Sequence, residues 1–375
     1  MKTLTINWFN TLDEGQAFFV DLKEAIFSEH INYDKALNGT NVDFQPQAND
    51  RMFAVDGSLI ISEYVKNYED LYEVDAIVSD DLALSMSNLK TPLFSVCDTP
   101  YLDVAKNLNE NGFWKKDLLF QKGYFYAHLQ KTQYDKSECV VCTSNDLKKY
   151  VKRTGFRKKI KVIEYAPSLD YWANAYGEYS KTKLKEEFGI PLEMPVGCSI
   201  TKFHPDSNYT LLRDLVLRFP KVFWLIMLEG NLVHKPKSKN VKIIEWPDAE
   251  MRRKVFNASN FYVNVNKFDY KNVYALQALS CDLPIVTPKR GYFNKKWFDG
   301  FTGERKNVEI TDFGIVIRNP QLRTYMKAVD DLIASSFDGE RFEFRPRDHF
   351  DAVDNTSDTF AFNWRVLIEE RNNNL

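Results

Sequence analysis

The sequence predicts an α/β protein with parallel sheets, divided into two similar halves. Short apolar runs with the character of buried strands alternate with runs in which apolar residues recur at helical spacing. This alternation is typical of parallel sheets whose strands are joined by helices. The 375 residues are enough for two domains, and a hydrophobic content of 44% supplies sizeable cores.

The first half begins with an apolar run and contains five expected strands, at 3–9, 75–78, 93–97, 139–143 and 160–164. Helices are expected at 16–27, 118–130 and 144–154. Ser144 or Asn145 is the expected N-cap of the last of these helices. The pattern stops at Ala166-Pro167-Ser168, where Pro167 disfavours helix in the residue before it. We therefore expect a junction between the two halves there.

The second half repeats the pattern. Strands are expected at 196–200, 222–228, 241–244, 261–265 and 284–287, and helices at 209–218 and 273–280. Pro220 ends the first of these two helices. The chain therefore reads as two Rossmann-like halves with a cleft between them, and small ligands usually bind at such domain interfaces.

Charge and cysteine content exclude several classes of protein. The net charge of −2 gives no global attraction to nucleic acid or membrane. No apolar run approaches the length of a membrane span. The five cysteines and the absence of a secretory signal favour a reducing cytosol. Cys139 and Cys142 form a C-x-x-C, but on a strand they point to opposite faces and no second pair follows, so no metal is expected.

The segment 261–291, FYVNVNKFDYKNVYALQALSCDLPIVTPKRG, is the most informative part of the chain. A strand leads through a polar loop into a short helix and then a second strand. Asn272 is the expected N-cap of this helix. Free amides and the helix dipole at such an end favour a phosphate, while Asp269 and Gln277 could hold the sugar and ribose of a nucleotide sugar. The alternative is an ordinary βαβ unit without a ligand.

Three segments together resemble the retaining GT-B glycosyltransferases of the family 4 type. They are VVCTSNDLKKYVKRTGFRKKIKVIEYAPSLDYW (140–172), NFYVNVNKFDYKNVYALQALSCDLPIVTPKRG (260–291) and FAFNWRVLIEE (360–370). The resemblance implies an acceptor-binding domain at 1–167 and a nucleotide-sugar-binding domain at 168–350. It also implies that a closing helix within 351–375 returns to the first domain. Transfer would need no tightly bound cofactor, and UDP is the default donor nucleotide.

The resemblance also assigns roles to individual residues, with departures from the family pattern. Asp269 and Gln277 stand where the family has two glutamates, and Asp269 would contact sugar hydroxyls while Gln277 would bind ribose. Lys202 stands at the diphosphate-binding arginine, Ser207 replaces a lysine, and Asp98 follows Cys97, which replaces a histidine. Asp98 would orient or deprotonate the acceptor. The full donor set implied is Gly15, Lys202, Asp269, Tyr270, Lys271, Asn272, Val273 and Gln277.

A basic stretch bears on the acceptor. It comprises Lys148, Lys149, Lys152, Arg153, Arg157 and Lys158, and aromatic residues are abundant elsewhere in this half. Basic grooves with aromatics suit nucleic acid. The composition resembles that of tailed-phage proteins, among which GT-B enzymes glycosylate hydroxymethylated cytosine in DNA. We therefore expect double-stranded DNA as acceptor, in the host cytoplasm if the source is viral. A solvated helix face is the alternative reading.

Other functions stay open. A glycan or small molecule could be the acceptor instead. An epimerase, a phosphorylase or a non-catalytic GT-B binding protein would share the fold. Asp80-Asp81 could imitate the metal-binding acidic pair of the other glycosyltransferase fold. The sequence leaves the oligomeric state undetermined.

Overall fold

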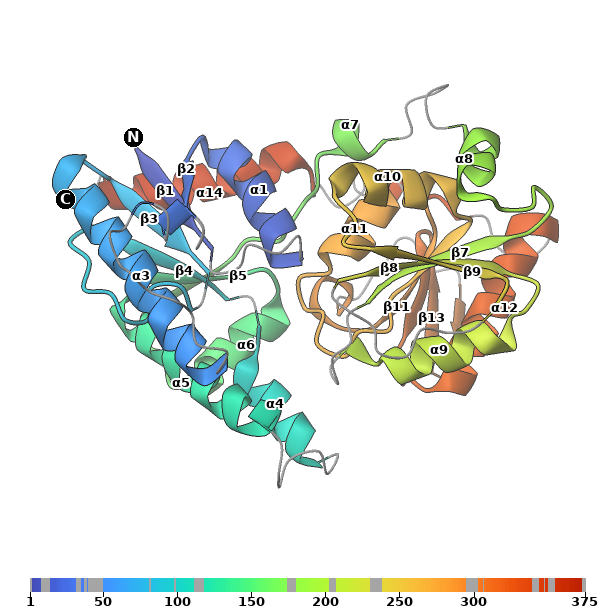
Figure 1. Ribbon diagram of the computed structural model, residues 1–375, viewed down its shortest axis with the longest axis horizontal. Coiled ribbons are helices and arrows are strands. Elements are labelled where there is room, and N and C mark those ends of the chain that lie inside the picture. The colour runs from blue at the N-terminus through green and yellow to red at the C-terminus, as the bar shows by residue number, and fades with distance from the viewer. Residues whose placement is uncertain are drawn as a thin grey trace. The chain divides into compact units, whose positions relative to one another are not determined.

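The computed structural model describes most of the chain in two structural units. The described residues are 2–7, 14–31, 35–36, 39, 50–80, 82–97, 99–110, 118–173, 180–201, 207–229, 238–294, 303–305, 307–338, 344–346, 348–349 and 355–372. The first unit contains Met1–Tyr165 and Asp358–Leu375, and the second contains Ala166–Ser357. Each unit is built around its own sheet (Figure 1).

The sheet of the first unit has six strands in the order β2-β1-β3-β4-β5-β6, and all its pairs are parallel. The strands are β1 (Thr3–Ile6), β2 (Glu29–Ile31), β3 (Ala76–Ser79), β4 (Leu93–Cys97), β5 (Cys139–Cys142) and β6 (Lys159–Val162). From β1 the chain goes to β2 on one side and then to β3 on the other. This order places a topological switch point between β1 and β3.

Helices cover both faces of this first sheet. They are α1 (Glu14–Ile26), α3 (Asp50–Leu71), α4 (Tyr101–Glu110), α5 (Leu118–Lys136), α6 (Asn145–Arg153) and α14 (Ser357–Asn372). Helices α1 and α14 lie on one face, and α3 and α5 lie on the other (Figure 1). Ser144 is the N-cap of α6, as expected, and its hydroxyl accepts a hydrogen bond from the amide of Leu147 at 3.4 Å.

The closing helix α14 belongs to the first unit, as the resemblance implied. The ring of Phe360 lies 5.9 Å from those of Phe18 and Tyr165, in edge-to-face contacts. Arg365 donates from Nε to the carbonyl of Ala25 at 3.0 Å. At the other end of the helix, Glu370 pairs with Lys159 of β6 at 3.0 Å. The chain therefore ends by packing on the domain with which it began.

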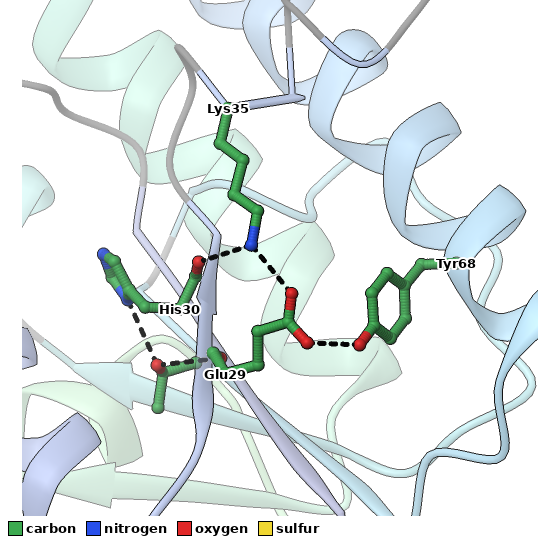
Figure 2. Close-up of polar contacts among 5 residues, drawn as sticks. Glu29, His30, Lys35 and Tyr68 are labelled. Carbon is green, nitrogen blue, oxygen red and sulfur yellow. Dashed lines mark hydrogen bonds and ion pairs between the residues drawn. The ribbon is translucent and has the colours of Figure 1, made fainter.

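The edge strand β2 is held by side chains on both of its faces (Figure 2). On one face, Glu29 accepts hydrogen bonds from Lys35 at 2.7 Å and from the hydroxyl of Tyr68 in α3. On the other face, His30 Nδ1 lies 3.1 Å from the hydroxyl of Thr5 in β1. Hydrogen bonds from Lys35 and Tyr68 hold the pKa of Glu29 below its ordinary value. These contacts fix a short strand that pairs with β1 alone among the described strands.

The second unit has an eight-stranded sheet in the order β12-β13-β14-β11-β10-β7-β8-β9. The strands are β7 (Val196–Thr201), β8 (Phe223–Leu228), β9 (Val241–Glu245), β10 (Phe261–Val263), β11 (Ile285–Pro288), β12 (Gly303–Arg305), β13 (Val308–Thr311) and β14 (Gly314–Ile317). The six strands from β14 to β9 are parallel, while β13 pairs antiparallel with both β12 and β14.

The helices of the second unit are α7 (Leu169–Trp172), α8 (Lys181–Phe188), α9 (Tyr209–Arg218), α10 (Ala249–Ala258), α11 (Val273–Ser280) and α12 (Leu322–Asp338), with a 3-10 turn at Gly291–Phe293. Helices α9 and α12 cover one face of the sheet, and α10 and α11 cover the other (Figure 1). Trp224 and Phe261 of the sheet and Leu212 and Leu332 of the helices are fully buried in the core on the α9 side.

Several predicted boundaries are corrected by tertiary contacts. The helix predicted at 118–130 continues to Lys136, because Gln133 is buried and donates from Nε2 to the Ser95 hydroxyl of β4 at 2.9 Å. The strand predicted at 261–265 ends at Val263, where the side chain of Asn264 turns to the following loop.

Among the described residues, no helix combines the length and apolarity that crossing a membrane requires.

Candidate functional site

The second sheet has its topological switch point between β7 and β10. After β7 the chain adds β8 and β9 on one side and then returns to place β10 on the other side of β7. Connections leaving β7 and β10 therefore diverge to opposite faces, and ligands of such sheets bind beyond the carboxyl ends of the strands at this point. The two helices that follow these strands are α9 and α11.

Both helices begin with an asparagine in the left-handed conformation. Asn208 has φ 55° before α9, and Asn272 has φ 58° before α11. Asparagine adopts this conformation more readily than most residues with a side chain. Neither asparagine side chain accepts a hydrogen bond from its own helix. The two asparagine side chains thus do not cap their helices, and the positive end of each helix dipole lies at the switch point.

The side chain of Asn272 is used to join two loops instead. Its Nδ2 donates to the carbonyl of Asp269 at 2.9 Å, and its Oδ1 accepts from the backbone N–H of Tyr292 at 2.8 Å. Gly291, which precedes Tyr292, has φ 57°. A Cβ atom there would lie 2.2 Å from the carbonyl oxygen of Tyr270. Only glycine permits this close approach, which presses the loop after β11 against the loop after β10.

Asp269 organises the loop between β10 and α11. Its Oδ1 accepts the backbone N–H of Asn272 at 2.7 Å, and its Oδ2 accepts Nδ2 of Asn264 at 2.7 Å. The residue is 6% exposed. Asn264 is itself held, because its carbonyl accepts the hydroxyl of Tyr325 at 2.8 Å. A carboxylate oxygen has two lone pairs, so each oxygen of Asp269 retains capacity for a second donor.

The first turn of α11 is also connected to β8. The hydroxyl of Tyr274 donates to the carboxylate of Glu229, the residue that follows β8. The guanidinium of Arg252 in α10 lies 5.4 Å from the centre of the Tyr274 ring. These contacts fix the start of α11 relative to strands on both sides of the switch point.

Positive charge gathers where β11 and β14 end. The buried carboxylate of Glu309 pairs with Lys289 and, at 2.7 Å, with Arg318. Burial pushes the pKa of Glu309 upward, but hydrogen bonds from Lys289 and Arg318 outweigh it and hold that pKa below its ordinary value. The guanidinium of the neighbouring Arg290 lies 5.8 Å from the centre of the Phe268 ring, in the loop after β10.

Six of the eight predicted donor residues lie on one loop and helix at this edge. Asp269, Tyr270, Lys271 and Asn272 form the end of the loop, Val273 starts α11, and Gln277 lies one turn further along. Lys271 and Gln277 are buried, at 5% and 1% exposed. Gly15 lies in the first turn of α1, in the other unit. Lys202 and the proposed acceptor residue Asp98 lie outside the described residues.

The six predicted acceptor-binding residues lie on α6 and the loop that follows it. Three of them have partners in the protein: Arg153 pairs with Asp103 at 2.6 Å, Lys149 with Asp146 at 3.9 Å, and Lys158 donates to the carbonyl of Asp135 at 2.8 Å. Lys148, Lys152 and Arg157 make no ion pair with the described part of the chain. The stretch is therefore less positive than its sequence suggests.

Asp80 has a local role at the carboxyl end of β3. Its Oδ1 accepts the backbone N–H groups of Leu82 at 3.1 Å and Ala83 at 2.9 Å. Asp81 lies outside the described residues. Across the residues that the structure describes, no three histidine, cysteine or acidic side chains are grouped as a metal site requires.

Sequence reasoning assigned no role at this edge to five of its residues, namely Glu229, Asn264, Thr287, Arg290 and Gly291. Each follows or ends a strand of the parallel sheet, or lies in the connection leaving it. That position is the signal that could have identified them, since such ends gather at one edge. Asn264 contacts Thr287 at 3.4 Å across two neighbouring strand ends, a proximity that spacing along the chain does not reveal.

Comparison with known proteins identifies the fold. No protein-family model matches the chain, and no curated protein matches its sequence. The structure is similar to sucrose-phosphate synthase from Thermosynechococcus elongatus, with 13% identity, complete coverage of both chains and a TM-score of 0.75.

Two further structures agree. HepE of Anabaena, determined in complex with UDP and glucose, is 11% identical and has a TM-score of 0.68, over 98% of this chain and 99% of its own. The catalytic domain of starch synthase IV from Arabidopsis thaliana, bound to ADP and acarbose, is 12% identical, with 99% of each chain covered and a TM-score of 0.69. The expected fold class is confirmed: the chain has two parallel-sheet α/β domains in the GT-B fold.

Proposed function

We propose that the protein is a glycosyltransferase that uses a nucleotide-diphosphate sugar as donor. The observation that carries this proposal is the switch point of the second sheet, where the asparagines before α9 and α11 make no cap hydrogen bond to their own helices and the buried Asn264–Asp269–Asn272 network leads into α11. A helix start of this kind stabilises the negative charge that a nucleoside diphosphate leaving group develops. The HepE and starch synthase IV structures contain UDP and ADP, respectively.

Several of the predicted residues have a specific role in this proposal. The positive end of the α11 helix dipole and the side chain of Lys202 hold the diphosphate, while the backbone N–H of Asn272 is donated to Asp269. Gln277 binds ribose, and Asp269 contacts sugar hydroxyls while keeping the loop in shape. Asp98 orients or deprotonates the acceptor hydroxyl. Transfer proceeds without a tightly bound cofactor or metal and, as in the family 4 type that the sequence resembles, with retention at the anomeric carbon.

The donor is tested with a panel of UDP-, GDP- and ADP-sugars, read as slow donor hydrolysis and as binding by calorimetry. We expect one nucleotide to bind and its sugar to be released slowly. The proposal would be rejected if no sugar nucleotide of the panel were hydrolysed and none bound. Asp269→Ala should abolish binding, because the loop loses both of its carboxylate bonds. Asp135→Ala, which removes an exposed carboxylate of α5 in the first unit, serves as a charge-matched control. Undiminished turnover in Asp269→Ala would show that the site is misplaced.

The acceptor proposal is a hydroxymethylated cytosine in duplex DNA of phage type. Its support in the first unit comes from Lys148, Lys152 and Arg157, three of the six predicted basic residues, which make no ion pair with the described part of the chain. Such an enzyme would act in the host cytoplasm and would have to flip the base out of the duplex. The five free, buried thiols are compatible with a reducing compartment.

Duplex DNA with and without hydroxymethylated cytosine tests this acceptor directly. A mass increase of one hexose on the modified duplex alone is the expected result, and the configuration of the new linkage by NMR reports retention or inversion. Transfer only to oligosaccharides would replace DNA by a glycan acceptor. Tight nucleotide binding without hydrolysis or transfer would favour a non-catalytic GT-B binding protein.

A further inference from the structure

We propose that Arg290 binds an anionic oxygen group of the donor, either its diphosphate or an acidic group on its sugar. This inference rests on the proposed function and adds a residue to it. Arg290 is the second residue after β11, whereas Lys202 follows β7 in the sequence. The argument depends on how firmly Arg290 is placed, on its charge, and on the geometry of its side chain.

The backbone beside Arg290 is fixed against the predicted donor loop. Gly291 leaves no room for a Cβ beside the carbonyl of Tyr270, and the next amide donates to Asn272. The Arg290 amide itself donates to the carbonyl of Pro288 at 2.8 Å. The side chain of Arg290 therefore starts within one residue of the contact between the two loops. Its guanidinium remains at that loop, over the ring of Phe268.

The charge of Arg290 is not neutralised by the described part of the protein. Glu309 is the carboxylate of this corner, and it already pairs with Lys289 and Arg318. This carboxylate is therefore already shared by two cations and is not available to Arg290. Arg290 is half-buried and makes no ion pair among the described residues. A half-buried cation of this kind favours an anionic ligand, since water screens it incompletely.

The guanidinium chemistry indicates what would bind. Its planar fork makes two parallel hydrogen bonds to phosphate or carboxylate oxygens, and one face stays free to stack on an aromatic ring. Stacking on Phe268 occupies a face of the guanidinium and leaves its N–H edge for the ligand. The ligand group is therefore a phosphate or a carboxylate, and the donor's diphosphate or an acidic sugar would each supply one.

Calorimetry on the full chain separates these sources. The probes are UDP, GDP and ADP, the matching nucleosides, and the pair UDP-glucose and UDP-glucuronate. Arg290→Gln is compared with Arg218→Gln, which removes an exposed arginine at the far end of α9, and with Arg290→Lys, which keeps the charge without the fork. Thermal melts confirm that each variant is folded.

If Arg290 binds the diphosphate, Arg290→Gln weakens every diphosphate probe about ten- to a hundredfold, the range for charged hydrogen bonds, and leaves nucleosides unchanged. The affinity of Arg290→Lys for these probes falls between the affinities of the parent and of Arg290→Gln. If it binds an acidic sugar, only UDP-glucuronate weakens. Equal affinities in Arg290→Gln and Arg218→Gln, with binding by the parent intact, would overturn this inference alone. Failure of the parent to bind any nucleotide would overturn the proposed function as well.

Discussion

The amide oxygen of Asn272 accepts the backbone N–H of Tyr292 at 2.8 Å, so one side chain joins the connections that leave β10 and β11. An asparagine that begins a helix normally turns its oxygen to the amides of that helix. Here the oxygen is committed to a neighbouring loop, and the amide group of the same side chain holds Asp269. Asn272 thereby positions the loop before α11, but its side chain does not bond to the amides of that helix.

Asn272→Ala should therefore destabilise the second unit by about 2–3 kcal/mol. The variant loses two hydrogen bonds worth about 1 kcal/mol each and places alanine in a left-handed conformation. Asn208→Ala is the matched control, because Asn208 has the same conformation without a side-chain cap. Urea unfolding measures both, and a loss no larger for Asn272→Ala than for the control would contradict the bridging role.

Gly291→Ala tests the close approach of the two loops. The new methyl group would lie 2.2 Å from the backbone oxygen of Tyr270, and φ is 57°. Backbone atoms must shift to admit it, so we expect a loss of about 3 kcal/mol or more and weaker nucleotide binding. Gly189→Ala has a similar φ of 70° with nothing within 4 Å, and should cost only about 1 kcal/mol. Equal destabilisation of the two variants would show that the loops can separate freely.

His30 should make the first unit less stable in mild acid. Burial, with repulsion from Lys23 and Lys35, lowers the pKa of its imidazole from 6.5 to about 4. The unfolded chain then binds the proton more readily, so this contribution is fully present above pH 6.5 and is lost as the pH falls through about 4. At about 1.4 kcal/mol per pKa unit, the loss is at most about 3 kcal/mol, reduced by water around the partly exposed ring.

Urea unfolding across this pH window measures the effect, with His30→Gln as comparison. The glutamine variant should show a shallower dependence between these two pH values, since it has no proton to bind there. Parallel curves for the parent and the variant would assign the acid sensitivity to other groups.

The thiols should be unreactive in the folded protein. Cys97, Cys139, Cys142, Cys198 and Cys281 are all free and buried. Burial raises the pKa of Cys139 to about 11 and that of Cys198 to about 12, so little thiolate exists at neutral pH. An aromatic disulfide reagent should titrate five thiols in denaturant and essentially none in native buffer. Rapid reaction of a native thiol would reveal local opening.

The sequence by itself determined the alternation of strands and helices and the limits of some elements. Helices α9 and α11 begin and end at the residues predicted, because an asparagine before each and an apolar period within it are local signals. The 22-residue helix α3 was not predicted, and α5 was predicted too short. In both helices, polar residues interrupt the apolar periodicity that a sequence pattern relies on. Contacts with the sheet stabilise these helices instead.

The tertiary structure decided what the polar side chains do. The sequence placed Asp269, Asn272 and Gln277 on one loop and helix, but the bond from Tyr292 to Asn272 depends on β10 and β11, which neighbour one another only in the folded sheet. Likewise Arg153 appeared as a free cation in its basic stretch, whereas the fold brings it to Asp103, fifty residues away. Local spacing fixes which residues share an element, and only packing brings distant charges and amides together.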